Sequence, residues 1–174
     1  MIIKAEIINQ PYSGQFKEKI YDISTPWNSQ NWTWVKFEDE DYHEWCGVFR
    51  GYPRAVALSK KYNKVLVLTS DHLFQVDCYS RELFDYESQT PYQCLTVTPS
   101  GDFIIADYYD IQKIESTLKV KSPINSPIKM DKIEFLGWVS NKLLIRCDEF
   151  LNWDNHVVLE LCGDTYEITL KDID

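Results

Sequence analysis

A pair of short apolar segments joined by a polar turn recurs three times at a spacing near 40 residues, and this repeat constrains the fold most. Val56 precedes Leu95 by 39 residues, and Val65 precedes Phe103 by 38. A third copy begins its second segment at Leu143, 40 residues after Phe103. Short apolar segments bounded by turn residues are typical of β-strands. The repeat therefore predicts an all-β protein built from antiparallel sheets.

The repeated region, residues 54–170, resembles the blades of a Trp-Asp-repeat propeller, because one blade has four strands over about 40–45 residues. Asp71 and Asp107 fall where strand pairs end, but the Gly-His and Trp-Asp signatures are missing. Three copies are also too few for a closed ring. The resemblance implies twisted, blade-like sheets in an open or incomplete β-propeller-like domain.

We expect one domain over residues 1–174, since this length suits a single core. In residues 1–53, strands are expected at Ile2–Ile8 and at residues 16–23, followed by an aromatic and acidic segment. This N-terminal part would cover an otherwise bare sheet edge. No window sustains an apolar helical period, so helix should be scarce.

Four local predictions follow from side-chain alternation, from proline, from a glycine turn and from the size of tryptophan. An extended segment over residues 32–37 would place Thr33, Val35 and Phe37 on one side. Residues 120–127 contain two prolines and are expected to form a surface connection. The closing segments, residues 156–161 and 165–170, should form a hairpin around a Gly-Asp turn. At least half of the six tryptophans should fill the core.

The charge indicates which partners suit this chain. Its formal net charge is −9 and its pI is about 4.8. A protein needs a cationic face to bind nucleic acids or anionic membranes, so neither is expected as a partner of this acidic chain. A protein partner should be basic. The sequence has no apolar run of membrane-spanning length, and its start lacks the pattern of a secretion signal. We therefore expect a cytoplasmic location.

No motif for a cofactor, a metal or a disulfide framework is found in the sequence. The five cysteines are odd in number and widely spaced, so they are expected to be reduced core residues. Glycine-rich phosphate cradles are missing, and the three histidines lack metal-ligand spacing. His43 is expected to be a solvated loop residue and His72 a turn residue. The expected cofactor and metal content is none.

Catalytic signatures are also missing. There is no Gly-x-Ser-x-Gly nucleophile elbow, and no cysteine can be matched to a histidine by spacing. The sequence predicts a protein that is not an enzyme, with no catalytic residue. One alternative stays open, a carboxylate-dependent hydrolase that uses Asp71, Asp107 and Asp148, which occupy similar places in the repeats.

Two aromatic and acidic stretches are the candidate partner-binding residues. A solvated loop is the plain interpretation of the first stretch, but its aromatic neighbours are the anchors that binding hot spots favour, and carboxylates steer cationic partners. The calcium-loop pattern is not met. The predicted residues of the first stretch are Glu38, Asp39, Glu40, Asp41, Tyr42, Glu44 and Trp45. Those of the second stretch are Asp107, Tyr108, Tyr109 and Asp110.

A small, acidic β-protein that carries such stretches resembles the immunity proteins that bacteria make against their own polymorphic or contact-dependent toxins. The resemblance implies a one-to-one complex with a cognate toxin domain, often a basic nuclease, whose active site the acidic and aromatic surface would occlude. The alternative of another class is a propeller-like scaffold or ligand-sensing protein in a multiprotein complex.

Overall fold

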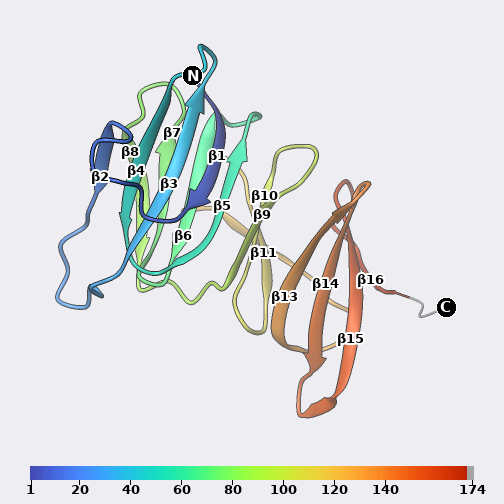
Figure 1. Cartoon of the computed structure of the whole chain (residues 1–174). Helices are drawn as coiled ribbons and strands as arrows, with labels where there is room; N and C mark the ends of the chain where they lie inside the picture. The colour runs from blue at the N-terminus through green and yellow to red at the C-terminus, as the bar shows by residue number, and fades with distance from the viewer. Residues whose placement is uncertain (172–174) are drawn as a thin grey trace. The chain divides into compact units, whose positions relative to one another are not determined.

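The computed structural model describes residues 1–171 (Figure 1). Over this range the chain forms sixteen β-strands and no helix, which confirms the predicted all-β class. The strands make four sheets of four strands each. It follows that no helix of the described part is long and apolar enough to cross a membrane.

The chain divides into two compact units, each with two sheets. The first unit comprises Met1–Thr90 together with Ser116–Leu118, and the second comprises Pro91–Glu115 and the chain from Lys119 onward. Within the first unit, the Gln75 side-chain amide donates a hydrogen bond to the Ser116 carbonyl oxygen at 3.0 Å, and Leu118 is buried. The expectation of a single domain stays a prediction.

The first unit contains an N-terminal sheet and the first repeat. The N-terminal sheet has the order β1-β3-β4-β2, with bounds β1 Ile2–Ile8, β2 Glu18–Tyr21, β3 Trp32–Asp39 and β4 Glu44–Arg50. The second sheet follows chain order, with β5 Pro53–Ser59, β6 Lys64–Thr69, β7 His72–Asp77 and β8 Leu83–Ser88. All pairs are antiparallel except β2 with β4, which are parallel.

The second unit contains the other two repeats, one sheet for each. The first of these sheets has β9 Cys94–Val97, β10 Phe103–Ala106, β11 Ile111–Ile114 and β12 Lys121–Ile124. The last sheet has β13 Met130–Val139, β14 Lys142–Glu149, β15 Asn152–Cys162 and β16 Ile168–Leu170. Each predicted repeat is therefore one four-stranded, blade-like sheet, and the predicted closing hairpin is the β15–β16 pair.

Strand β3 shows why this sequence forms a half-buried sheet. Thr33, Val35 and Phe37 are fully buried, whereas the residues between them are only half-buried. This alternation confirms the predicted core side of the strand. The buried side joins β4 and the second sheet in one core, where the Phe49 ring lies 4.5 Å from the Tyr21 ring and 5.2 Å from the Phe74 ring.

Two local predictions were wrong. Residues Lys121–Ile124 form an edge strand and not a surface connection, since an edge position tolerates a proline that donates no hydrogen bond. The tryptophans are less buried than expected. Trp45 is buried, but Trp27 and Trp153 are 75% and 62% exposed, and the other three are half-buried.

Of the five free cysteines, Cys46, Cys78 and Cys147 are buried, and burial raises the pKa of each thiol to about 11.

Candidate functional site

The first predicted stretch forms a hairpin, here called the acidic hairpin (residues 38–45). Glu38 and Asp39 end strand β3, Glu44 begins strand β4, and Glu38 pairs with Glu44 across the hairpin. The turn closes through hydrogen bonds from the Asp39 amide to the His43 carbonyl oxygen at 3.1 Å and from the Tyr42 amide to the Asp39 carbonyl oxygen at 3.0 Å. The five carboxylates therefore lie on the ends of two strands and on the turn between them. The sequence had predicted that all five lie in the connection between the strands.

Two residues of the acidic hairpin belong to the core and not to the surface. Asp39 is 3% exposed, because strand alternation places it on the same side as Phe37. Its carboxylate accepts hydrogen bonds from the Asp41 and His43 amides at 2.9 and 3.0 Å and from Arg81 at 2.7 Å. The His43 amide contributes most to lowering the pKa of Asp39. Trp45 is 6% exposed and stacks on the Phe37 ring at 4.4 Å, so neither residue is available to a partner.

The exposed residues of the acidic hairpin carry less free charge than the sequence suggests. Glu40 lies 3.3 Å from the N-terminal amine, and Glu44 lies 3.2 Å from the Lys36 ammonium. Asp41 and Tyr42 are exposed. Asp39, Asp41 and the exposed His43 bring possible metal-ligand atoms within 4.8 Å of one another, but the Asp39 oxygens already hold the turn and Arg81. Partner contact by the exposed residues stays a prediction.

The second predicted stretch forms a sharp corner between β10 and β11. The Asp107 carboxylate accepts hydrogen bonds from the Tyr109 and Asp110 amides at 2.7 and 2.8 Å, as an aspartate does in a side-chain-stabilised turn. This geometry leaves Tyr108 and Tyr109 50% and 52% exposed. Asp110 is exposed as well. The corner therefore presents two aromatic rings and a carboxylate to solvent.

A groove of about 730 Å³ lies beside this corner in the second unit. Ile111, Ile124 and Met130 supply buried apolar side chains to its lining. Asp110, Gln112, Asn125, Ser126 and Lys129 supply the polar groups. The remaining lining residues are Tyr109, Pro123, Ile128 and Phe150. An apolar floor with a few polar groups is the usual composition of a binding site.

Aromatic side chains stand along one side of the groove. The Tyr109 ring meets the Phe150 ring nearly at a right angle, with the ring centres 6.0 Å apart, and Phe150 is 40% exposed. The Phe150 amide donates to the Lys129 carbonyl oxygen at 2.9 Å, which fixes the connection between β14 and β15 at this point. The next residues, Leu151 and Trp153, are 76% and 62% exposed.

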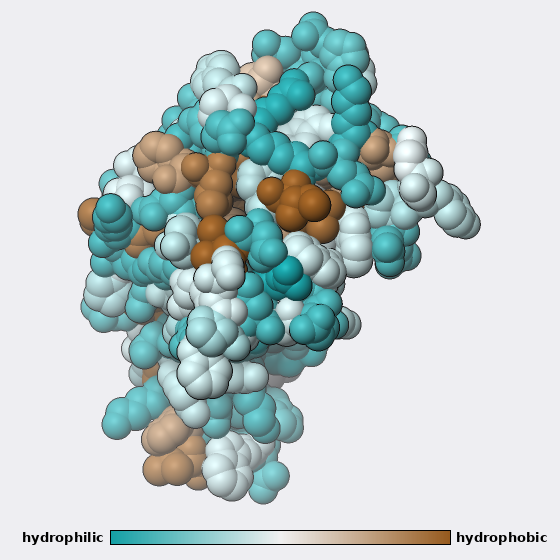
Figure 2. Space-filling model, turned by 90° about the vertical axis from the view of Figure 1, so that its left-hand side faces the viewer, coloured by the Kyte–Doolittle hydropathy of each residue, from teal (hydrophilic) through white to brown (hydrophobic). Residues whose placement is uncertain are grey.

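Sequence reasoning missed Phe150, Leu151 and Trp153. Their signal was present, because apolar residues stand in the connection between two predicted strands, where polar turn residues are the rule. On the face seen in Figure 2, hydrophilic residues predominate and hydrophobic residues form small separate patches. The exposed pair Tyr109 and Phe150, which lines the groove, is a candidate contact surface.

The three carboxylates of the hydrolase alternative are engaged in structural contacts. Asp148 is 7% exposed and lies 2.6 Å from the His156 ring and 3.1 Å from the Lys132 ammonium. The His156 hydrogen bond is the main cause of its lowered pKa. Asp107 holds the corner described above, and Asp71 belongs to the other unit.

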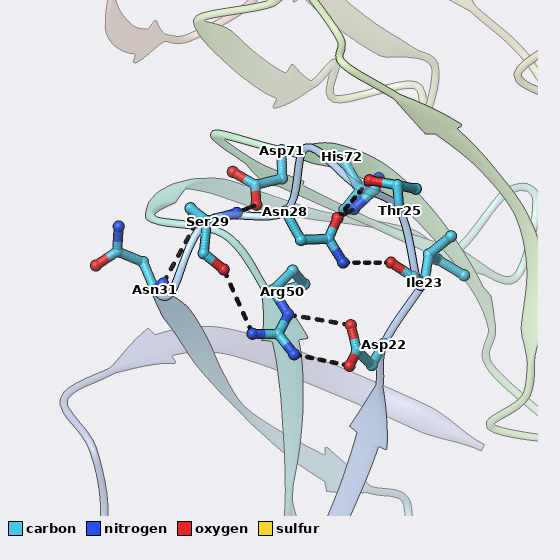
Figure 3. Close-up of polar contacts among 9 residues, drawn as sticks. All are labelled: Asp22, Ile23, Thr25, Asn28, Ser29, Asn31, Arg50, Asp71 and His72. Atoms are coloured by element: carbon cyan, nitrogen blue, oxygen red, sulfur yellow. Dashed lines mark hydrogen bonds and ion pairs between the residues drawn. The ribbon is translucent and has the colours of Figure 1, made fainter.

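A polar network in the first unit, shown in Figure 3, was not expected from the sequence. Arg50 donates two hydrogen bonds to the Asp22 carboxylate at 3.0 and 2.8 Å, and its guanidinium lies 3.6 Å from the centre of the Trp32 ring. The Ser29 amide donates to Asp71 at 2.7 Å. The Arg50 contacts attach the segment between β2 and β3 to the end of β4, and the Ser29 contact attaches it to the corner between β6 and β7.

His72 lies at one end of this network and corrects the expectation of a turn residue. It is the first residue of β7 and is 1% exposed. The Asn28 amide nitrogen donates to the Ile23 carbonyl oxygen, so the Asn28 oxygen must accept from the His72 Nε2, 3.1 Å away. The buried Nδ1 then has no partner. Burial is the main cause that lowers the pKa of His72, so the ring is neutral at pH 7.

No protein-family model matches the chain, and no curated protein matches it. Among solved structures it is similar to the dihydro-heme d1 dehydrogenase NirN in complex with DHE, at 14% identity and a TM-score of 0.48 over 81% of this chain and 44% of that one. It is also similar to luciferin-regenerating enzyme, at 14% identity and a TM-score of 0.42 over 82% of this chain and 54% of that one. The chain thus spans about half the length of the structures it matches.

The comparison corrects one expectation from the sequence. Both similar structures are enzymes by name, and the expectation that this chain is not an enzyme is therefore not upheld. The likeness concerns the fold, and it assigns neither a reaction nor a ligand to this chain.

Proposed function

We propose that this protein acts by binding a basic protein partner through the groove of the second unit. The observation that carries this proposal is the exposed Tyr109–Phe150 pair beside an apolar groove. Aromatic residues in such positions dominate the binding energy of protein interfaces, because they bury a large area with few rotatable bonds. The groove would receive apolar side chains of the partner.

The charges near the groove support a basic partner. Asp107 and Asp110 stand at the corner, and Glu149 precedes Phe150 in the chain. Hydrogen bonds from Asn155 and Asn152 lower the pKa of Glu149, which keeps this carboxylate ionised. Lys129 is the one cation among the residues that line the groove. The excess of carboxylates, together with the net charge of −9, would speed the approach of a cationic protein.

We propose a cognate toxin domain as the partner, as the resemblance to bacterial immunity proteins implies. A nuclease toxin has a cationic cleft for phosphates, and carboxylates of the immunity protein would occupy that cleft. The complex would contain one copy of each protein. Inhibition would then be steric and electrostatic.

The experiment is affinity capture from the native host, followed by binding measurements with the captured protein. The double substitution Tyr109→Ala and Phe150→Ala should weaken binding about a hundredfold, since losing one hot-spot side chain costs about 1–2 kcal/mol or more. The matched control is Tyr12→Ala, which removes a ring that is 87% exposed in the first unit. Equal binding by the double variant and the control would exclude the groove as the contact site.

A further inference from the structure

A second cavity lies in the first unit, separate from the groove. Its volume is about 230 Å³, below the roughly 300–1,000 Å³ of a typical small-molecule site, so it suits a single small group. It is formed by the segment between β2 and β3, the corner between β6 and β7, and the residues that follow β8. Its lining residues are Thr25, Trp27, Asn28, Ser70, Asp71, His72, Gln89 and Thr90. Most of these residues offer polar atoms, so the occupant should form hydrogen bonds.

Among the described residues that line this cavity, Asp71 is the only one with a charged side chain at neutral pH. Burial raises the pKa of Asp71, but hydrogen bonds from Ser70 and Ser29 outweigh that effect, and the pKa lies below its usual value. No lysine or arginine is among the lining residues, and His72 is neutral for the reason given above. The cavity therefore carries one negative charge at neutral pH.

The Asp71 carboxylate is oriented and retains capacity to accept hydrogen bonds. Ser70 donates its hydroxyl to one oxygen at 2.6 Å, and the Ser29 amide donates to the other at 2.7 Å. The backbone N–H of Gln89 donates a hydrogen bond to the Asp71 carbonyl oxygen at 2.7 Å, which fixes the backbone at this corner. The Ser29 side chain also donates a hydrogen bond to this carboxylate. A carboxylate accepts about four hydrogen bonds in all, so Asp71 has room for one more donor.

Trp27 supplies the second feature of the cavity. Its ring is 75% exposed, although it lines the same cavity as Asp71. An indole ring attracts cations to its face, and it is the best of the aromatic side chains for this contact. A carboxylate and an accessible indole ring in one small cavity are complementary to a cation that also donates hydrogen bonds.

We propose that this cavity binds an ammonium or guanidinium group, which pairs with Asp71 and lies against the ring of Trp27. An anion would be repelled by Asp71, and a neutral sugar would not pair with its charge. Arg50 interacts electrostatically with Asp71, but its guanidinium is paired with Asp22. The group belongs either to a free small amine or guanidine, or to a lysine or arginine side chain of another protein. The site does not depend on the function proposed above, because the groove is in the other unit.

The test is an NMR titration of the isotope-labelled full chain with ethylguanidinium, methylammonium and N-acetyl-arginine amide. The expected result is a saturable shift of the Ser70 and Gln89 amides. If both N-acetyl-arginine amide and ethylguanidinium bind when titrated separately, the cavity can accept a protein side chain. If ethylguanidinium binds and N-acetyl-arginine amide does not, the natural ligand is a free small molecule.

Two variants and one control decide the outcome. Asp71→Asn keeps an acceptor for Ser29 and should weaken binding at least about tenfold, and Trp27→Leu, at an exposed position, should weaken it severalfold. Asp41→Asn makes the same charge change on an exposed residue outside the cavity and should change affinity less than about twofold. The proposal is overturned if Asp71→Asn and Asp41→Asn bind alike, if no shift occurs, or if acetate or glucose shifts the same amides as strongly.

Discussion

The buried His72 makes a sharp prediction about stability at mildly acidic pH. In the folded chain its Nε2 donates to Asn28, while its Nδ1 is buried without a partner. A second proton would therefore place a charge on a buried atom that has nothing to accept its hydrogen bond. The unfolded chain has no such constraint, and its histidine titrates near pH 6.5. The pKa of His72 is lower in the folded chain, so the unfolded state binds more protons than the folded state as the pH drops through 6.5. The free energy of unfolding therefore decreases as the pH is lowered.

The size of this effect follows from one proton. Between about pH 7.5 and 5.5 the loss is at most about 1.4 kcal/mol, the value for a folded ring that takes up no proton over this range, since one unit of pKa corresponds to about 1.4 kcal/mol. The assay is urea unfolding at both pH values, with tryptophan fluorescence as the readout. His72→Gln should be less stable at pH 7.5 but should lack this pH-dependent loss.

The control for this prediction is His43→Gln, because His43 is exposed on the acidic hairpin. This variant should keep the loss seen in the unsubstituted chain. If His72→Gln loses as much stability between the two pH values as His43→Gln does, the buried ring is not the cause. The tautomer assigned from Asn28 would then have no measurable consequence.

Three further predictions concern packing, a turn and the acidic hairpin. Gly47→Ala should cost about 1–3 kcal/mol in thermal unfolding, because the new Cβ would lie 2.6 and 2.7 Å from ring atoms of Phe37 and Phe49, both fully buried. Hydrogen bonding to Lys64 is the main cause that lowers the pKa of Asp77 to about 2, so its stabilisation is present above about pH 4 and is lost as pH falls through 2. Asp77→Asn should cost about 1–2 kcal/mol at pH 7, after screening by solvent, and the difference from the unsubstituted chain in urea unfolding should vanish near pH 2. Glu40→Lys with Asp41→Lys should slow association with the captured partner and make it less salt-dependent, as measured by stopped-flow kinetics; an unchanged rate would remove the acidic hairpin from the encounter surface.

The parts of the fold that were predicted from sequence are those set by local periodicity. In β3, alternation alone identified the buried side, because Thr33, Val35 and Phe37 recur every second residue. Each repeat became one sheet, because its strands follow one another and are joined by short turns. The strands of the N-terminal sheet were expected, but their order was not, since β2 pairs in parallel with β4 and no local pattern records such a partner.

The candidate sites were predicted only where their residues are neighbours in the sequence. The Asp107–Asp110 corner was found because aromatic and acidic residues follow an apolar strand directly. Its neighbour Phe150 comes from another sheet, and only the fold brings it to Tyr109. His72 looked like a turn residue beside Ser70 and Asp71, because the partner of its ring, Asn28, is more than forty residues away in the chain.

The short segment Ser116–Leu118 has a consequence for anyone who wishes to divide this protein. It belongs to the first unit although the chain on both sides of it belongs to the second, so the polypeptide passes between the units three times. A single proteolytic cut or stop codon at residue 90 would not yield the intact first unit. Such a fragment would lack Leu118 and would leave the Gln75 amide without its acceptor. Truncation studies should therefore keep the chain continuous through residue 118 and judge each unit by point substitutions.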